Sequence, residues 1–424
     1  MLTRFRSTVA GYPRQYWVLF WGLLINSIGG GLWWPFLTIY MRERLAVPLT
    51  TITLLFTLNA VAGLAAMSIA GPAVDRFGRR FAMIIGLVAS GSILLAMSVA
   101  QTLQVWALLM LVQGLFNPFY RVGSDAMVAD LIPPARRAGA YALLRMINNL
   151  GIAIGPAIGG FVIGVSYGLA FYIAAAANLL FVTLIVFFVR ETLPSRTASP
   201  AHGSGADGGA QVGVPQREGG YGPVLRDRPF VALCGVFVLA TMPAAIMMML
   251  LAVYAKENFG VPESQYGFIM ATNAAMVVLF QYAVTRRSQA YPPLQVLALG
   301  AFFYAIGAGS VALGGGFWGF WLSMVILTIG ELLIAPTGTA VAANLAPPDM
   351  RGRYMGLYGI TWGVAFGIGP VIAGSINDNV APRAMWLFAL AAGLAAAAGF
   401  LLLRKKLTGR PGYSAQTAQP AAGQ

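Results

Sequence analysis

Long stretches of apolar residues, separated by short polar segments, repeat along the whole chain. Each stretch has few charges and reaches the length of about 20 residues that an α-helix needs to cross a bilayer. The pattern predicts twelve such helices. In the first half they cover 16–40, 50–73, 81–100, 104–128, 140–165 and 168–190. In the second half they cover 229–255, 264–285, 292–314, 317–342, 353–376 and 382–403.

The composition favours a membrane protein and excludes other classes. Hydrophobic residues make up 58% of the 424 residues and charged residues only 9%, with a mean hydropathy of +0.74. One soluble core cannot hold that much apolar surface. The apolar stretches are continuous rather than alternating, so they indicate helices and not an outer-membrane barrel. The single cysteine, Cys234, excludes a disulfide scaffold and is expected to be a buried, unreactive thiol.

The net charge of +14 is explained by where the basic residues lie along the chain. With twelve helices and the N-terminus inside, 21 of the 27 basic residues fall on the cytoplasmic side. This distribution follows the positive-inside rule, so no nucleic-acid partner is needed to account for the charge. We expect a multi-pass protein of a bacterial inner membrane, with both termini in the cytoplasm.

The chain divides into two six-helix bundles. We assign 1–190 to the first bundle, 191–228 to a flexible cytoplasmic linker, 229–404 to the second bundle and 405–424 to a cytoplasmic tail. Superposing 131–160 on 345–374 gives ten identities in thirty positions, and we call this displacement along the chain the repeat shift. Both halves keep the same orientation, so the repeat predicts a parallel duplication about an axis along the membrane normal, which encloses a central cavity.

The loop between the second and third predicted helices carries a charged motif. From Gly71 to Arg80 it follows the pattern G-x-x-x-D-R-x-G-R-R. This loop resembles the signature loop of the major facilitator superfamily, and with the twelve helices and the repeat the resemblance covers essentially the whole chain. It implies an all-α membrane protein with twelve transmembrane helices in two six-helix bundles. The candidate gating residues are Gly71, Asp75, Arg76, Gly78, Arg79, Arg80 and Asp130.

These loop charges lie where they can hold the two halves together. Asp75 can accept hydrogen bonds or face the positive N-terminus of a neighbouring helix, while the arginines lie at headgroup depth. The resemblance places Asp130 against Arg76. Alternatively, the arginines only fix the orientation of the chain in the membrane. The equivalent loop of the second half, 285–287, has no acid. Only the loop of the first half therefore carries both the acidic and the basic residues that could hold the halves together.

The fifth predicted helix carries a row of glycines. Gly151, Gly155, Pro156, Gly159 and Gly160 resemble the G-x-x-x-G-P-x-x-G-G motif of the superfamily's drug:proton antiporters. Three of the glycines recur every four residues and form a groove that lets a neighbouring backbone approach, and the proline can bend the helix. Tight packing alone explains the same residues, and it is compatible with a rocking motion of the halves.

Two acids lie within predicted helices, and Glu331 is the deeper one. It falls about 3 Å from the centre of the tenth helix, where a carboxylate is costly unless it is paired or neutralised. Such a group can exchange a proton and attract a cationic compound. The alternatives are a structural ion pair and a permanently protonated carboxyl. Several multidrug exchangers that the chain resembles also carry an acid in the tenth helix.

Three further charges occupy the fourth and fifth predicted helices. Arg121 and Asp125 are four residues apart and share a helix face, and Arg145 is close enough in topology to join them. They form either a charge network that rearranges on gating or a static salt bridge. Proton-coupled relatives often carry an arginine three residues before Gln-Gly in the fourth helix, but here Met110 precedes Gln113.

Polar, methionine and aromatic side chains within the helices are further candidates for a cavity lining. More often such side chains pack helices together or face lipid. The candidates are Asn26, Asn117, Asn148, Asn149, Met242, Asn273 and Trp362.

These observations predict a secondary active transporter and not an enzyme. The hypothesis is proton-coupled efflux of hydrophobic or cationic drugs by alternating access, by a monomer in the lipid bilayer that needs no cofactor and no metal. One alternative is transport of a specific metabolite, sugar or lipid, and another is a membrane sensor or scaffold without transport. None of the three lysines stands in a G-x-x-x-x-G-K motif, so the chain has no phosphate-binding loop of that type.

Overall fold

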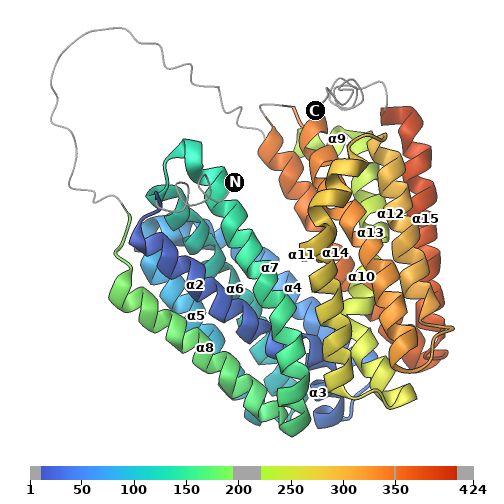
Figure 1. Cartoon of the computed structure of the whole chain (residues 1–424), viewed down its shortest axis with the longest axis horizontal. Helices are drawn as coiled ribbons and strands as arrows, with labels where there is room; N and C mark the ends of the chain where they lie inside the picture. Colours follow the sequence, from blue (N-terminus) through green and yellow to red (C-terminus); the bar gives the residue numbers. More distant parts are fainter. Residues whose placement is uncertain (1–10, 194–220, 348–349, 408–424) are drawn as a thin grey trace, which may run out of the picture.

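The computed structural model describes residues 11–193, 221–347 and 350–407, and every regular element within them is helical (Figure 1). The first half consists of α2 (Arg14–Trp33), η1 (Trp34–Phe36), α3 (Leu37–Leu45), α4 (Leu49–Phe77), α5 (Arg79–Val99), α6 (Leu103–Leu131), α7 (Pro134–Val165) and α8 (Tyr167–Phe188). The second half consists of α9 (Gly222–Arg226), α10 (Arg228–Phe259), α11 (Glu263–Ser288), α12 (Pro293–Ser310), α13 (Gly316–Leu345), α14 (Arg351–Asn379) and α15 (Ala384–Leu407).

Twelve segments of the described chain are long and apolar enough to cross a membrane, which confirms the predicted fold class. Most of the expected linker, 191–228, lies outside the described residues, and so does most of the expected tail, 405–424.

The first membrane segment is not one continuous helix, and the apolar pattern alone misses this. α2 ends at Trp33, a 3₁₀ turn follows, and α3 starts at Leu37. Pro35 lies within the turn, and because it has no N–H it removes one hydrogen bond of the helical ladder. The break divides the segment into a long part and a short part.

Proline and glycine set many of the helix boundaries. Pro13, Pro48, Pro262 and Pro292 stand directly before α2, α4, α11 and α12. A missing N–H is harmless there, because the first N–H groups of a helix have no partner within it. Gly78 separates α4 from α5 with φ of 105°, a backbone conformation that favours glycine.

The helices of the second half repeat those of the first at a constant spacing. The repeat shift, which superposes 131–160 on 345–374, carries the first residues of α2, α4 and α5 onto the first residues of α10, α11 and α12. It also carries the last residue of α6 onto the last residue of α13. Residues that the repeat shift relates in these helices are therefore structural counterparts.

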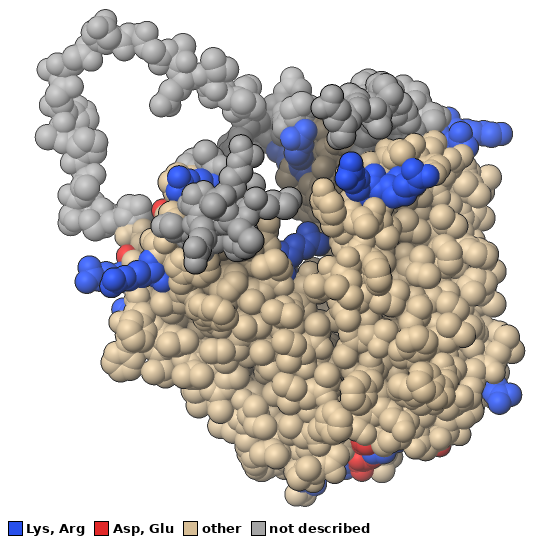
Figure 2. All heavy atoms as spheres, in the orientation of Figure 1, with Lys and Arg blue, Asp and Glu red and all other residues tan. Residues whose placement is uncertain are grey.

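The two halves meet mainly along two helix pairs, α7 with α11 and α4 with α14, and α10 also contacts η1 and α3. We call the face where α2 begins and α15 ends the terminal face, and the face where α3 and α10 end the opposite face. The halves touch near the opposite face and separate toward the terminal face (Figure 1). The space-filling view shows a hollow between them that opens at the terminal face and contains basic side chains (Figure 2).

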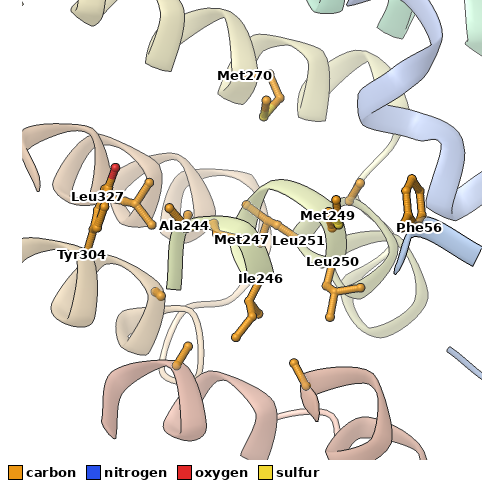
Figure 3. Packing of buried hydrophobic residues seen from close by; sticks show 14 of the residues in the cluster. Phe56, Ala244, Ile246, Met247, Met249, Leu250, Leu251, Met270, Tyr304 and Leu327 are labelled. Atoms are coloured by element: carbon orange, nitrogen blue, oxygen red, sulfur yellow. The ribbon is translucent and has the colours of Figure 1, made fainter. Parts of the chain in front are cut away.

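The core and the outer surface are both apolar. Met247, Leu250 and Leu251 of α10 are completely buried where this helix packs among its neighbours (Figure 3). On the outside, large apolar side chains such as Leu313 and Tyr282 are 92% and 79% exposed. In Figure 2 the charged side chains gather toward the two faces and leave an uncharged band between them. Such a band suits a lipid environment.

Candidate functional site

Glu331 lies at the middle of α13, beside α11. Its Oε2 accepts a hydrogen bond of 2.8 Å from Nδ2 of Asn273 in α11. The same amide donates to Oγ1 of Thr328 at 2.9 Å, and Thr328 donates to the carbonyl of Met324 at 2.7 Å. Asn273 and Thr328 are 7% and 0% exposed, and Glu331 is half-buried. The ion pairs within 4.0 Å among the described residues do not include Glu331.

Two opposite influences act on the protonation of this carboxyl group. The amide of Asn273 stabilises the ionised carboxylate, because a hydrogen bond to a charged acceptor is stronger than one to a neutral acceptor. Burial without a cationic partner favours the neutral acid instead. Because the two influences oppose each other, and because no ion pair fixes the charge, neither form is locked in place.

The counterpart positions of the first half hold no acid. Asn59 is the counterpart of Asn273, and its Nδ2 donates to the carbonyl of Met110 at 2.8 Å. Asn117 stands where the second half has Glu331, and it is exposed. The duplicated asparagine therefore binds a backbone carbonyl in one half and a carboxyl group in the other.

The three charges in the fourth and fifth membrane helices form no ion pair among the described residues. Arg121, Asp125 and Arg145 are all exposed, and none lies within 4.0 Å of an opposite charge on a described residue. Tyr141 of α7 donates to the backbone carbonyl of Asp125 at 2.7 Å, which joins α7 to α6. The static salt bridge that the sequence allows is therefore not formed in this conformation.

The signature loop connects helices within the first half. Arg79 pairs with Asp130 at 3.0 Å and with Asp75 at 3.4 Å. The sequence-based expectation that Asp130 meets Arg76 is wrong for this conformation. Arg79 opens α5, the helix that packs beside α6, whereas Arg76 lies over the ring of Phe77. Neither ion pair of Arg79 reaches the second half, and Asp75 is 71% exposed.

Glu191 completes this loop, and sequence reasoning missed it. Its two carboxylate oxygens accept hydrogen bonds from the backbone N–H groups of Arg79 and Arg80, each at 3.0 Å. These groups start α5, where an acid satisfies free N–H groups and interacts favourably with the helix dipole. A Cβ on Gly78 would collide with this carboxylate, whereas Gly71 has open space around it. Arg80 also donates to a carbonyl near the end of α8 at 2.7 Å.

The glycine motif of α7 contacts two different helices. A Cβ added to Gly151, Gly155 or Gly159 would lie 2.5–2.6 Å from atoms of α2, so these glycines let the two backbones touch. Gly160 faces α11 instead, where its added Cβ would lie 2.5 Å from a backbone oxygen. The carbonyl of Pro156 also contacts α11. One face of α7 is therefore packed within its own half, and another face meets the second half.

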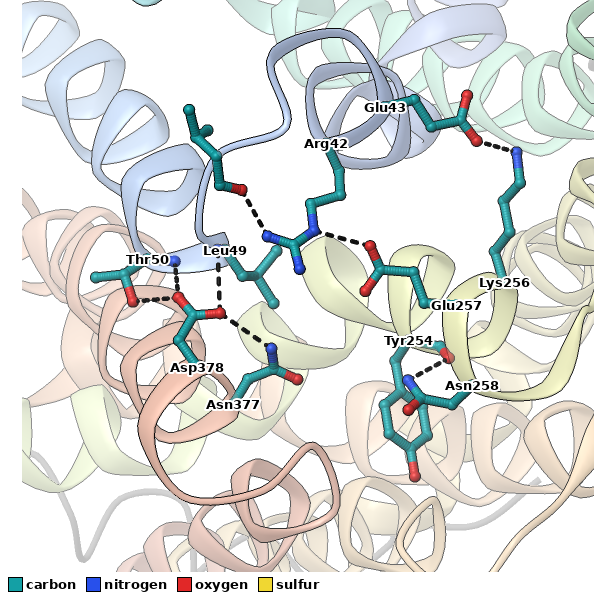
Figure 4. Close-up of polar contacts among 11 residues, drawn as sticks. Arg42, Glu43, Leu49, Thr50, Tyr254, Lys256, Glu257, Asn258, Asn377 and Asp378 are labelled. Carbon is teal, nitrogen blue, oxygen red and sulfur yellow. Dashed lines mark hydrogen bonds and ion pairs between the residues drawn. The ribbon is translucent and has the colours of Figure 1, made fainter.

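At the opposite face, two reciprocal ion pairs connect the halves (Figure 4). Arg42 of α3 binds Glu257 of α10 at 2.8 Å, and Lys256 of α10 binds Glu43 of α3. Arg42 and Lys256 are counterparts, and so are Glu43 and Glu257. Each half thus supplies one basic–acidic dipeptide, and the contact is self-complementary. Sequence reasoning missed this closure, although the repeat shift aligns the two dipeptides.

Further contacts support the same closure. Lys256 also binds Glu263, which accepts a hydrogen bond of 2.6 Å from Tyr167 of the first half. Asp378, near the end of α14, accepts hydrogen bonds of 3.2 and 2.8 Å from the first two backbone N–H groups of α4. The opposite face is therefore held shut by charge pairs and by helix capping.

The remaining cavity candidates divide into packed and accessible positions. Asn26 donates to Asn178, and Asn148 accepts a hydrogen bond of 2.7 Å from Ser27, so both join helices of the first half. Met242 does not line the hollow in this conformation, because it is 6% exposed and packs against a glycine of α14. Asn117 is exposed, and Asn149 and Trp362 are half-buried, as are Asn26 and Asn148.

Comparisons with other sequences identify relatives along nearly the whole chain. A sequence model of the Major Facilitator Superfamily matches residues 19–257 and 232–422. The chain is 25% identical over 389 residues to the Na(+), Li(+), K(+)/H(+) antiporter of Planococcus maritimus, covering 87% of this chain and 90% of that protein. It is 22% identical over 366 residues to the quinolone resistance protein NorA of Staphylococcus aureus, covering 86% and 90%.

Solved structures share the fold at low sequence identity. The nucleoside transporter NupG superposes with a TM-score of 0.72 at 13% identity, covering 93% of this chain and 100% of that chain. The peptide transporter POT in complex with sulfate gives a TM-score of 0.71 at 18% identity, covering 93% and 94%. None of these relatives points to an enzymatic family. Sequence match, helix arrangement and internal repeat agree, and the chain belongs to the major facilitator superfamily of membrane transporters.

Proposed function

We propose that this protein exchanges protons for a hydrophobic, cationic compound, and that Glu331 carries the proton. The observation that supports this most is the position of Glu331 in mid-helix, with a hydrogen bond from Asn273 and no ion pair among the described residues. A proton and a cationic group compete for one carboxylate, and this competition couples the release of one to the binding of the other. By name, one relative exchanges cations for protons and another confers drug resistance.

The side to which the protein is open follows from the orientation that we propose. The arginines of the signature loop and the basic end of α15 lie at the terminal face, which supports a cytoplasmic location for that face. The protein is then open to the cytoplasm and closed to the outside. Export requires the reciprocal ion pairs to break while the halves close at the terminal face, in a rocking motion about the α7–α11 and α4–α14 contacts.

The replacement Glu331→Gln tests the coupling. Glutamine keeps the shape of the side chain and can still pair with Asn273, but it cannot ionise. In proteoliposomes with an imposed pH gradient, we expect this variant to insert normally and to lose proton-driven export of a cationic dye such as ethidium. Asp125→Asn, which neutralises the other acid within the spans, is the matched control and should keep export. Normal dye export with normal proton counterflow by Glu331→Gln would refute the proposal.

A second candidate substrate is an alkali cation. The observation that favours it is the carboxylate of Glu331, which forms no ion pair among the described residues, because hard cations prefer oxygen ligands. The relative from Planococcus maritimus is by name an alkali cation/proton antiporter. Adding Na⁺, Li⁺ or K⁺ to vesicles that hold a pH gradient separates the two candidates. An alkali-cation exchanger dissipates the gradient without any dye, whereas a drug exchanger requires the dye.

A further inference from the structure

Two arginines of the first half, Arg121 and Arg145, lie well inside their membrane helices, and neither forms an ion pair with a described residue. Arg145 of α7 is exposed and makes no hydrogen bond or ion pair with any described residue. Arg121 of α6 is also exposed, and it acts on Asp125 through its charge without reaching salt-bridge distance. A guanidinium group at this depth is too costly to leave in lipid, so it must face water or a charged ligand.

The helix geometry shows where Arg145 points. It lies eleven residues before Pro156, which is close to three full turns, so the two residues share one side of α7. The carbonyl oxygen of Pro156 lies 2.5 Å from where a Cβ on Gly267 of α11 would be. Near the opposite face this side of α7 therefore touches the second half. Toward the terminal face the halves separate, and the same side of α7 faces the hollow of Figure 2.

The second half has no matching positive charge at the counterpart positions. Arg121 and Arg145 correspond to Ala335 and Gly359. The ionisable residue that the second half contributes at mid-helix is Glu331. Arg145 therefore brings a positive charge to the first half's side of the hollow, and the other half offers an acid.

We propose that Arg145, together with Arg121 of the same half, binds an acidic group of the transported compound. The substrate is then amphoteric: its carboxylate or equivalent anion binds the first half, and its cationic group binds Glu331 in the second half. Arginine suits this task because its planar guanidinium can donate two parallel hydrogen bonds to a carboxylate. This inference rests on the proposed function and adds the charge pattern of the substrate to it.

A pair of dyes that differ in one charge tests this proposal. A rhodamine free acid is a zwitterion, and its methyl ester is a cation with the same ring system. Arg145→Gln should raise the KM for the free acid by about tenfold, as expected for the loss of one hydrogen bond to a charged group. The KM for the ester should stay unchanged, and Arg145→Lys should restore part of the affinity for the acid. Arg136→Gln removes the same charge from an exposed position on the same helix and should affect neither dye.

The outcomes separate this proposal from the function on which it rests. Equal losses for both dyes in Arg145→Gln would mean that Arg145 acts in the movement of the halves, and would overturn the anion site while leaving proton-coupled export intact. Wild-type protein that exports the ester but not the free acid would also overturn it. Failure of the wild type to move either dye under a pH gradient would instead refute the proposed function, and the anion site with it.

Discussion

The two halves of the chain share a scaffold but differ in mid-membrane. At the opposite face they are equivalent, because the basic–acidic dipeptide of each half binds that of the other. At mid-membrane they are not, since Thr328 and Glu331 stand where the first half has Gly114 and Asn117. The asparagines of α4 and α11 keep their places in both halves. Closure is therefore a property of the pair, whereas the proposed proton site belongs to one half.

Replacing either of two counterpart glycines, Gly155 and Gly369, should show the largest difference between the halves, in the stability of the protein. A Cβ on Gly155 would lie 2.6 Å from the Cα of Gly31, whereas the nearest atom to one on Gly369 is 3.2 Å away, on the flexible side chain of Met242. Gly155→Ala must push two backbones apart and should lower the free energy of unfolding by about 1–3 kcal/mol. Gly369→Ala gains helix propensity and should be neutral or stabilising by up to about 1 kcal/mol.

The Tm of thermal unfolding reports the stability of both glycine variants. Cys234 is the single cysteine and is buried, so a thiol-reactive dye reports its exposure as the protein unfolds. We expect a lower Tm for Gly155→Ala and an unchanged or higher Tm for Gly369→Ala. Equal changes in Tm would show that the two glycines are packed alike, and would remove this asymmetry.

The second largest difference is expected between the counterpart asparagines, Asn273 and Asn59. Their replacement should differ in its effect on proton-driven transport rather than on stability. Asn273→Ala removes the donor to Glu331 and should slow proton-driven transport about tenfold, because a hydrogen bond to a charged group is lost. Asn59→Ala frees only the carbonyl of Met110 and should leave the transport rate per inserted molecule nearly unchanged. Initial rates in proteoliposomes, normalised to inserted protein, provide the measurement. A similar slowing by both variants would mean that Asn273 acts through packing and not through the acid.

The smallest effect is expected from the reciprocal ion pairs, because exposed pairs contribute about 0.2–1 kcal/mol each. Lys256→Gln should open the opposite face more than Arg42→Gln does, since Lys256 also contacts the hydroxyl and the ring of Tyr167 in the first half. The measurement is the rate at which a thiol reagent labels a cysteine placed at Thr53, which is 1% exposed, in a Cys234→Ala background. Faster labelling in Arg42→Gln than in Lys256→Gln would contradict this order.

The sequence was sufficient to predict the twelve membrane helices and the repeat. Apolar runs of this length allow one spanning structure, and the identities shared by 131–160 and 345–374 reveal the duplication. The deep position of Glu331 also followed from counting residues along its helix. Its hydrogen bond to Asn273 did not, because the two residues come from helices whose packing the apolar pattern does not determine.

Features that depend on packing between helices were beyond sequence reasoning. The partner of Asp130 depends on which arginine opens α5, and a motif alone cannot decide that. Met242 is a plausible cavity residue by composition, but it fills space next to a glycine of α14. Glu191 carries no sequence signal apart from its place shortly after the end of α8 at Phe188. The break at Pro35 and the paired dipeptides did leave signals, namely the proline itself and the repeat shift.

The reciprocal ion pairs bear on the origin of the protein. Arg42 and Glu43 meet Lys256 and Glu257 across an axis that relates the two halves. A single six-helix chain with one such dipeptide would bind a second copy of itself through the same two bonds. The two ion pairs at the opposite face are therefore compatible with a homodimeric ancestor, in which they joined two identical subunits. Gene fusion then linked the subunits and left each copy free to diverge.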